Sequence, residues 1–316
     1  MNRTRFIGTT VGALAASAIP LAADASETDI ALQTPTGSIA GTLTLPSDGP
    51  CPVVLIVAGS GPVDRNGNSG PIRADTYALL AAALAARGIA SVRYDKRGVA
   101  GSAAAATSEA ALRFETYIDD AAAWLRLLDA DHRFTRVVLA GHSEGAMVGL
   151  VAVQHAPAAA YVSLEGPGRP IPTVLREQLE PKLPPDLYAK ADAITTALQA
   201  GKTVDNVPPE LWSLFRTSVQ PYLISWFRYV PADEIAKVRI PTTIVQGTAD
   251  VQVSMVDANA LAKAQPAAKL DVIDGMNHML KHAPDTSSQA AILAGYTDAS
   301  LPIVPQAVDA VASAAG

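Results

Sequence analysis

Residues 136–145 read RVVLAGHSEG, and this stretch decides the fold. A short apolar strand pattern at residues 136–140 runs directly into the pentapeptide G-x-S-x-G, and a helical pattern follows at residues 144–154. The two glycines remove side chains that would collide in a tight strand-to-helix turn, and such a turn lifts the serine hydroxyl above the sheet. The stretch therefore predicts that Ser143 is a nucleophile on a strand-turn-helix unit.

Apolar runs rich in β-branched residues recur on both sides of this unit. They lie at residues 52–57, 89–94, 160–164, 242–246 and 270–273, with helical patterns between them at residues 74–86, 115–128 and 256–264. Strands that alternate with helices predict an α/β fold, a mostly parallel central sheet flanked by helices. Two alternating apolar patterns, at residues 30–33 and 38–45, predict an antiparallel hairpin ahead of it.

The alternation is interrupted at residues 166–237, where only helical patterns occur. We interpret this stretch, the cap segment, as a helical cap inserted into a core made of residues 26–165 and 238–316. Ligand sites at domain junctions favour aromatic walls. We therefore expect four cap aromatics to bind substrate, while the alternative is that they only hold the cap together. These four are Trp212, Phe215, Trp226 and Phe227.

The N-terminal residues predict export. Two arginines precede a mildly apolar run at residues 6–23. Ala23 and Ala25 provide small residues at the two positions that a signal peptidase recognises before its cleavage site. Thr, Gly, Ser and Pro interrupt the run, so it is too polar for a membrane anchor of about 20 apolar residues. We expect residues 1–25 to be a signal peptide cleaved before Ser26, giving a periplasmic or secreted protein without stable membrane insertion.

Composition excludes several other classes. The formal net charge of −6 argues against a nucleic-acid partner, because phosphate binding needs a basic face. A single cysteine, Cys51, excludes an intramolecular disulfide and a cysteine-based zinc site. No metal or organic cofactor is called for, and the sequence does not indicate an oligomeric state.

A serine nucleophile needs a base and an acid, and in this type of fold the acid comes before the histidine along the chain. His278 directly follows the last predicted strand, where its loop can reach over Ser143. Asp250 follows the strand before it and is predicted to orient the imidazole. Glu165, at the end of a still earlier strand, is the alternative acid. His142 is expected to point away from the nucleophile.

Acyl chemistry also needs two donors for the oxyanion. The first is the N–H of Glu144, directly after the nucleophile. The second is expected in the loop that follows the strand at residues 52–57, where we nominate the N–H of Ser60, with Gly61 as the alternative. This loop has no third glycine at the spacing that a dinucleotide site requires, and no helix follows it at once.

With these features in place, residues 26–316 resemble a secreted esterase of the α/β-hydrolase fold. The loop GSGPVDRNGN at residues 59–68 is similar to the Gly-Ser-Gly-Pro loop of a bacterial carboxylesterase branch related to dienelactone hydrolases and prolyl oligopeptidases. YDKRG at residues 94–98 and LEGPGRP at residues 164–170 are similar to the loop after the fourth core strand and to the entry of the cap in that branch.

The resemblance implies hydrolysis of a small-molecule carboxylic ester through an acyl-enzyme on Ser143. It also suggests structural roles, in which Asp95 and Arg97 form a buried ion pair while Asp64 and Arg65 order the oxyanion loop. Members of this fold have other activities too. A serine peptidase is the alternative function, and a non-catalytic binding protein is disfavoured because no residue of the expected triad is missing.

Overall fold

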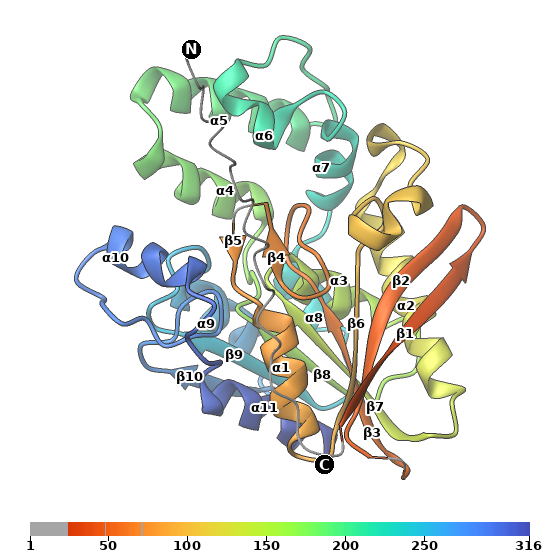
Figure 1. Ribbon diagram of the computed structural model, residues 1–316. Coiled ribbons are helices and arrows are strands. Elements are labelled where there is room, and N and C mark those ends of the chain that lie inside the picture. The colour runs from red at the N-terminus through yellow and green to blue at the C-terminus, as the bar shows by residue number, and fades with distance from the viewer. Residues whose placement is uncertain (1–24, 48, 71) are drawn as a thin grey trace, which may run out of the picture.

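The computed structural model describes residues 25–47, 49–70 and 72–316 (Figure 1). Residues 1–24, and with them nearly all of the expected signal peptide, lie outside the described residues. Ten strands are assigned: β1 (Ser26–Thr34), β2 (Gly37–Leu45), β3 (Cys51–Val57), β4 (Asn68–Ser69), β5 (Ile72–Arg73), β6 (Ala90–Tyr94), β7 (Phe134–His142), β8 (Ala160–Leu164), β9 (Thr242–Gly247) and β10 (Lys269–Ile273).

Eight of these strands form one sheet in the order β1-β2-β6-β3-β7-β8-β9-β10. The β1–β2 hairpin is antiparallel and joins β6 in antiparallel fashion. Every pairing from β6 to β10 is parallel. The expected hairpin and the mostly parallel sheet are therefore confirmed.

Helices cover both faces of the sheet (Figure 1). One face carries α1 (Thr76–Ala85) and α11 (Pro305–Ala315), and the other carries α2 (Phe114–Asp129), α3 (Glu144–Ala152) and α9 (Met255–Ala264). Successive side chains of a strand point to opposite faces. Accordingly, Val54 and Ile56 of β3 lie in the core beneath α1 and α11, whereas Val53, Leu55 and Val57 lie in the core beneath α2 and α3. This two-sided burial is why β3 is apolar throughout.

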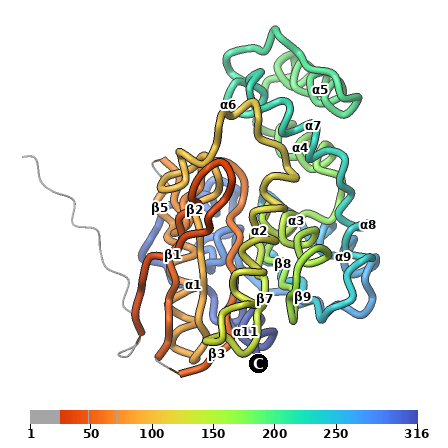
Figure 2. The backbone as a smooth tube through the Cα atoms, turned by 90° about the vertical axis from the view of Figure 1, so that its right-hand side faces the viewer, coloured from red at the N-terminus to blue at the C-terminus, as the bar shows by residue number. Residues whose placement is uncertain are grey.

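Between β8 and β9 the described chain contains helices and no strand. The helices are α4 (Ile171–Leu179), α5 (Pro185–Gln199), α6 (Trp212–Phe215), α7 (Gln220–Trp226) and α8 (Pro231–Ile235). Figures 1 and 2 both show α4 to α7 lying beyond the edge of the sheet at which β8 ends. After β10 the chain adds α10 (Gln289–Ala294) before α11. Within the described ranges, no helix combines the length and the apolar character needed to cross a bilayer.

Candidate active site

Ser143 occupies a sharp turn between β7 and α3. Its backbone has φ 55° and ψ −120°, a strained conformation for a residue other than glycine. Its N–H donates to the carbonyl of Leu164 at 2.9 Å. A Cβ on Gly141 would lie 2.2 Å from the carbonyl oxygen of Gly145, and one on Gly145 would lie 2.2 Å from that of Val57. Both flanking glycines are therefore required by close backbone approach.

The structure brings His278 and Asp250 together. The Nδ1 atom of His278 lies 2.6 Å from Oδ2 of Asp250, and their side chains are 3% and 0% exposed. The other oxygen of Asp250 accepts the N–H groups of Gln252 and Val253 at 2.7 and 3.0 Å. Burial raises the pKa of Asp250, but the charge and hydrogen bond of His278 outweigh it, so the pKa lies below its usual value. The Ser143 hydroxyl has no hydrogen-bond partner among the described residues.

Glu165, the alternative acid, does not contact the imidazole of His278 through a hydrogen bond. Its side chain is fully buried, and Oε1 accepts the N–H of Gly247 at 2.9 Å. Burial and the nearby charge of Asp250 raise the pKa of Glu165 well above its usual value. Both effects favour the protonated form of this carboxyl group. It is therefore Asp250 that orients His278 in this structure.

His142 belongs to a network that the sequence did not reveal. The hydroxyl of Tyr77 accepts the N–H of Gly59 at 2.9 Å and donates to Nδ1 of His142 at 2.8 Å, because the proton of the neutral ring is on Nε2, which faces a carbonyl. The Nε2–H of His142 then donates to the carbonyl of His278 at 2.7 Å. Burial lowers the pKa of His142 to about 3, which keeps the ring neutral. The rings of His142 and His278 lie 4.8 Å apart. His142 thus supports the loop that carries His278, and no sequence signal linked it to Tyr77.

The loop after β3 passes directly beside the nucleophile. A Cβ on Gly59 would lie 3.2 Å from the Cβ of Ser143. The next residue, Ser60, is exposed, and its N–H donates to no described residue. The N–H of Glu144, at the first turn of α3, is likewise free of a partner within the described chain. Both nominated oxyanion donors are therefore available to a ligand.

A cavity of about 370 Å³ lies against the loop after β3 and the first residue of α3, and Ser143, Asp250 and His278 are not among its lining residues. Its lining includes Gly61, Pro62, Lys96, Tyr117 and Glu144 from the core, and Arg216, Val219 and Tyr222 from the cap segment. Lys96 Nζ lies 3.2 Å from Glu144 Oε1, and Arg216 is paired with Glu109. The hydroxyl of Tyr222 is buried without a hydrogen-bond partner among the described residues. Both carboxylates of the lining, Glu109 and Glu144, are thus paired with a cation of the same lining, while Arg97 pairs with Asp120 outside it.

None of the four expected cap aromatics lines this cavity. Phe215 is fully buried, and Trp226 stacks on Phe114 with ring centroids 5.5 Å apart. Trp212 is 57% exposed, and Phe227 is half-buried. The cap aromatic that does line the cavity is Tyr222, because α7 turns this face toward the core. The sequence showed which segment was rich in aromatics but not which side chain faced inward.

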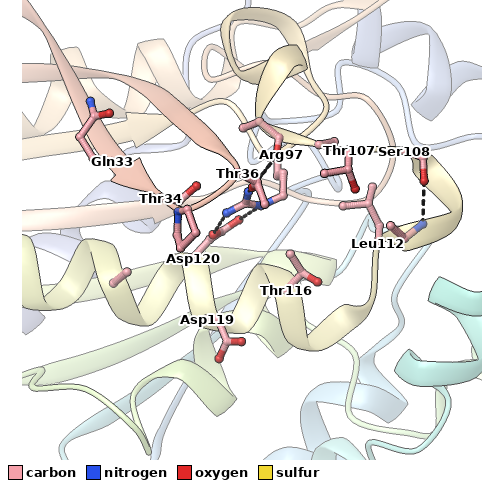
Figure 3. Close-up of a pocket in the computed structure, with 15 residues that line it drawn as sticks. Gln33, Thr34, Thr36, Arg97, Thr107, Ser108, Leu112, Thr116, Asp119 and Asp120 are labelled. Carbon is pink, nitrogen blue, oxygen red and sulfur yellow. Dashed lines mark hydrogen bonds and ion pairs between the residues drawn. The ribbon is translucent and has the colours of Figure 1, made fainter.

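The expected ion pair between Asp95 and Arg97 is wrong. Asp95 instead accepts from the guanidinium and from the backbone N–H of Arg65, each at 2.7 Å. Arg97 forms a two-point pair with Asp120 at 2.6 and 3.0 Å and also donates to Thr36. Figure 3 shows Arg97, Asp120 and Thr36 together on the wall of a second cavity, of about 450 Å³. Each residue of the expected pair thus anchors a different segment, and Arg65 is committed to Asp95 rather than to a substrate.

Groups suited to metal or thiol chemistry do not gather at this edge. Within the described part of the chain, no three His, Cys, Asp or Glu side chains are grouped so as to hold a metal ion. Cys51 is buried in β3, and burial raises the pKa of its thiol. The side chains assembled near Ser143 are those of nucleophilic and acid–base chemistry.

Comparison with known proteins agrees with this geometry. A family described as "Alpha/beta hydrolase family" matches residues 16–290. The chain belongs to the alpha/beta hydrolase family. The resemblance drawn from the elbow and its flanking loops is thereby confirmed. This alpha/beta hydrolase is 27% identical over 244 residues to Esterase EstD from Thermotoga maritima, a match that covers 76% of this chain. The chain spans 57% of the length of that relative.

Solved structures share the fold of this alpha/beta hydrolase. Est1E from Butyrivibrio proteoclasticus, in a structure with ferulic acid bound, aligns with a TM-score of 0.58 at 16% identity, covering 90% of this chain and 99% of that one. The esterase domain of a Rhodothermus marinus protein aligns with a TM-score of 0.52 at 20% identity, covering 86% and 95%. At these identities the likeness shows the fold alone.

Proposed function

We propose that this alpha/beta hydrolase cleaves small carboxylic esters through an acyl-enzyme on Ser143. The observation that carries the proposal is the 2.6 Å contact between His278 Nδ1 and the buried Asp250, next to the strained turn at Ser143. With Nδ1 held by a carboxylate, Nε2 of His278 is the nitrogen free to act as a base. The esterase name of the Thermotoga maritima relative supports ester substrates.

The proposed reaction has two halves. His278 Nε2 takes the proton of the Ser143 hydroxyl as the oxygen attacks the ester carbonyl carbon, and the N–H groups of Ser60 and Glu144 stabilise the tetrahedral oxyanion. The carbon–oxygen bond to the alcohol breaks, and the alcohol leaves with the proton from His278. Water then attacks the acyl-enzyme by the same steps, releasing the acid and restoring Ser143.

The charges of the cavity favour an ester over a peptide. An aminopeptidase needs an unpaired carboxylate for the ammonium group of its substrate. Two carboxylates line the cavity, and each already has a cation, since Glu144 pairs with Lys96 and Glu109 pairs with Arg216. A neutral ester fits this lining without leaving a charge unpaired, whereas a peptide amino terminus would have to break one of the pairs.

The test compares two substrate series on one purified protein. We expect p-nitrophenyl esters of graded acyl length to be hydrolysed with higher kcat/KM than aminoacyl p-nitroanilides. Ser143→Ala should lower kcat by roughly a millionfold, because the triad acts as a unit. Intact-protein mass spectrometry after rapid quenching should show one acyl group added to the wild type and none to the variant. Faster cleavage of the anilides, or activity that survives in Ser143→Ala, would overturn the proposal.

A further inference from the structure

The backbone of Gly59 is held from both sides, although it lies in a loop. Its N–H donates to the hydroxyl of Tyr77 at 2.9 Å. Its carbonyl accepts a hydrogen bond from Lys96 Nζ at 2.5 Å. Both partners are buried, and the side chain of Lys96 is only 3% exposed. The orientation of the peptide groups that flank Gly59 is therefore set by two side chains from other elements.

The carbonyl of Gly59 and the N–H of Ser60 belong to the same peptide group. That group is planar and trans, so the two bonds point in opposite directions. When Lys96 holds the carbonyl, it also determines that the N–H of Ser60 points away from the ammonium. Because Gly59 packs against Ser143, this peptide group lies close to the nucleophile.

Lys96 also reaches the segment that carries the second oxyanion donor. Its Nζ lies 3.2 Å from Oε1 of Glu144, whose side chain is 3% exposed, and 5.3 Å from the centroid of the Tyr117 ring. One ammonium therefore bridges the loop after β3 and the first residue of α3. We propose that Lys96 is a positioning residue that orients the oxyanion hole, by fixing the Gly59–Ser60 peptide group relative to the backbone of Glu144. This inference rests on the proposed acyl transfer.

A purely structural role is the competing explanation, since Lys96 also neutralises the buried carboxylate of Glu144. Lys96→Met alone does not separate the two roles, because it leaves that carboxylate buried and unpaired, which is strongly destabilising. The double variant Lys96→Met/Glu144→Gln removes both charges and keeps similar side-chain volumes. Its proper reference is the single variant Glu144→Gln. There the Lys96 ammonium loses its carboxylate but keeps the carbonyl of Gly59, the Tyr117 ring and the amide oxygen of the new side chain as partners. The melting temperatures of both variants are measured, so that a loss of stability is separated from a loss of kcat.

We expect the double variant to have a kcat about 100-fold to 1,000-fold below that of Glu144→Gln with little change in KM, the loss typical of one oxyanion donor. Arg93→Met is a control for the loss of a buried cation, because Arg93 of β6 pairs with Glu27 and reaches the loop after β3 only at Asn66, not at Gly59. This control should lower the melting temperature and retain the wild-type kcat. A double variant with the kcat of Glu144→Gln, or one altered only in KM, would overturn the proposal.

Phenylboronic acid gives a second readout that needs no turnover. It forms a tetrahedral adduct by bonding boron to the Ser143 oxygen, with the hydroxyl proton passing to His278, and so probes the oxyanion hole directly. We expect its affinity to fall in the double variant by about the same factor as kcat. If the wild type does not hydrolyse esters but the double variant binds the boronate more weakly than Glu144→Gln does, the ester proposal is rejected and the role of Lys96 is retained. If the double variant binds the boronate as tightly as Glu144→Gln does, the role of Lys96 is rejected.

Discussion

Replacing Asp250 by asparagine tests the site at its best-defined contact. In the wild type, Oδ1 of Asp250 accepts two backbone N–H groups, from Gln252 and Val253, while Oδ2 faces Nδ1 of His278. The amide oxygen of an asparagine has to take the first position, because an NH₂ group there would face two donors. The NH₂ group is then directed at His278.

This orientation predicts the wrong imidazole tautomer. An NH₂ group donates to Nδ1 of His278, so the proton of the neutral ring moves to Nε2, the atom that should accept the proton of Ser143. Loss of the correct tautomer in a triad of this kind lowers kcat about ten-thousandfold, equivalent to about 5.4 kcal/mol of transition-state stabilisation. The fold should survive, because the two backbone hydrogen bonds are kept.

The assay is kcat on a p-nitrophenyl ester, measured beside a thermal melt. Glu165→Gln is the matched control, because Glu165 is a buried carboxyl group on the neighbouring strand end that makes no hydrogen bond to His278 among the described residues. We expect this variant to lose much less activity than Asp250→Asn. The reasoning is refuted if the Asp250 variant keeps a tenth of the wild-type kcat, or if Glu165→Gln proves as damaging.

Three further predictions concern stability, the cap and export. Burial lowers the pKa of His142 from 6.5 to about 3, so between these pH values only the unfolded chain binds this proton. The free energy of unfolding should therefore fall as the pH falls below about 6.5, by up to about 1.4 kcal/mol per pH unit. Urea melts at several pH values should show a weaker pH dependence of this free energy in His142→Gln, and an equal pH dependence would contradict the prediction. Phe215→Ala should cost about 3–5 kcal/mol of stability without changing the acyl-length profile. Tyr222→Ala should instead shift kcat/KM toward longer esters, by about 10-fold per methylene on a C2 to C12 series. A changed profile in Phe215→Ala together with an unchanged one in Tyr222→Ala would contradict the cavity assignment. Mass spectrometry of exported protein should find Ser26 at the N-terminus, and an intact chain confined to the cytoplasm would refute the signal peptide.

The elements that were predicted well are those whose sequence pattern is dictated by burial. β3 is apolar at nearly every position because helices cover it on both sides, and its expected range of 52–57 differs from Cys51–Val57 by one residue. α11 was not predicted. Its sequence, PQAVDAVASAA, does have the helical period, with Ala307, Val308, Ala310, Val311 and Ala315 on the buried face, so this helix could have been predicted.

Side-chain partners were harder to predict than elements. The resemblance suggested that Asp95 and Arg97 pair with each other, yet Asp95 binds Arg65 and Arg97 binds Asp120, each on a segment distant in sequence. The contacts of the cap aromatics could not be predicted for the same reason. A pattern shows that Trp226 and Tyr222 lie on one helix, but their packing against Phe114 or against the cavity depends on how that helix sits on the core.

The site itself follows from one topological fact, the parallel run of strands β6-β3-β7-β8-β9-β10. Parallel strands end at a common edge, so loops distant in sequence meet there. In strand order the residues that follow them are Lys96, Ser60, Ser143, Glu165, Asp250 and His278. The sequence could assign all six to strand ends, because each follows an apolar run, but it could not order the strands. Lys96 lies 37 residues from Gly59 and reaches its carbonyl because β6 pairs with β3. A residue that orients the oxyanion hole was therefore invisible until the strand order was known.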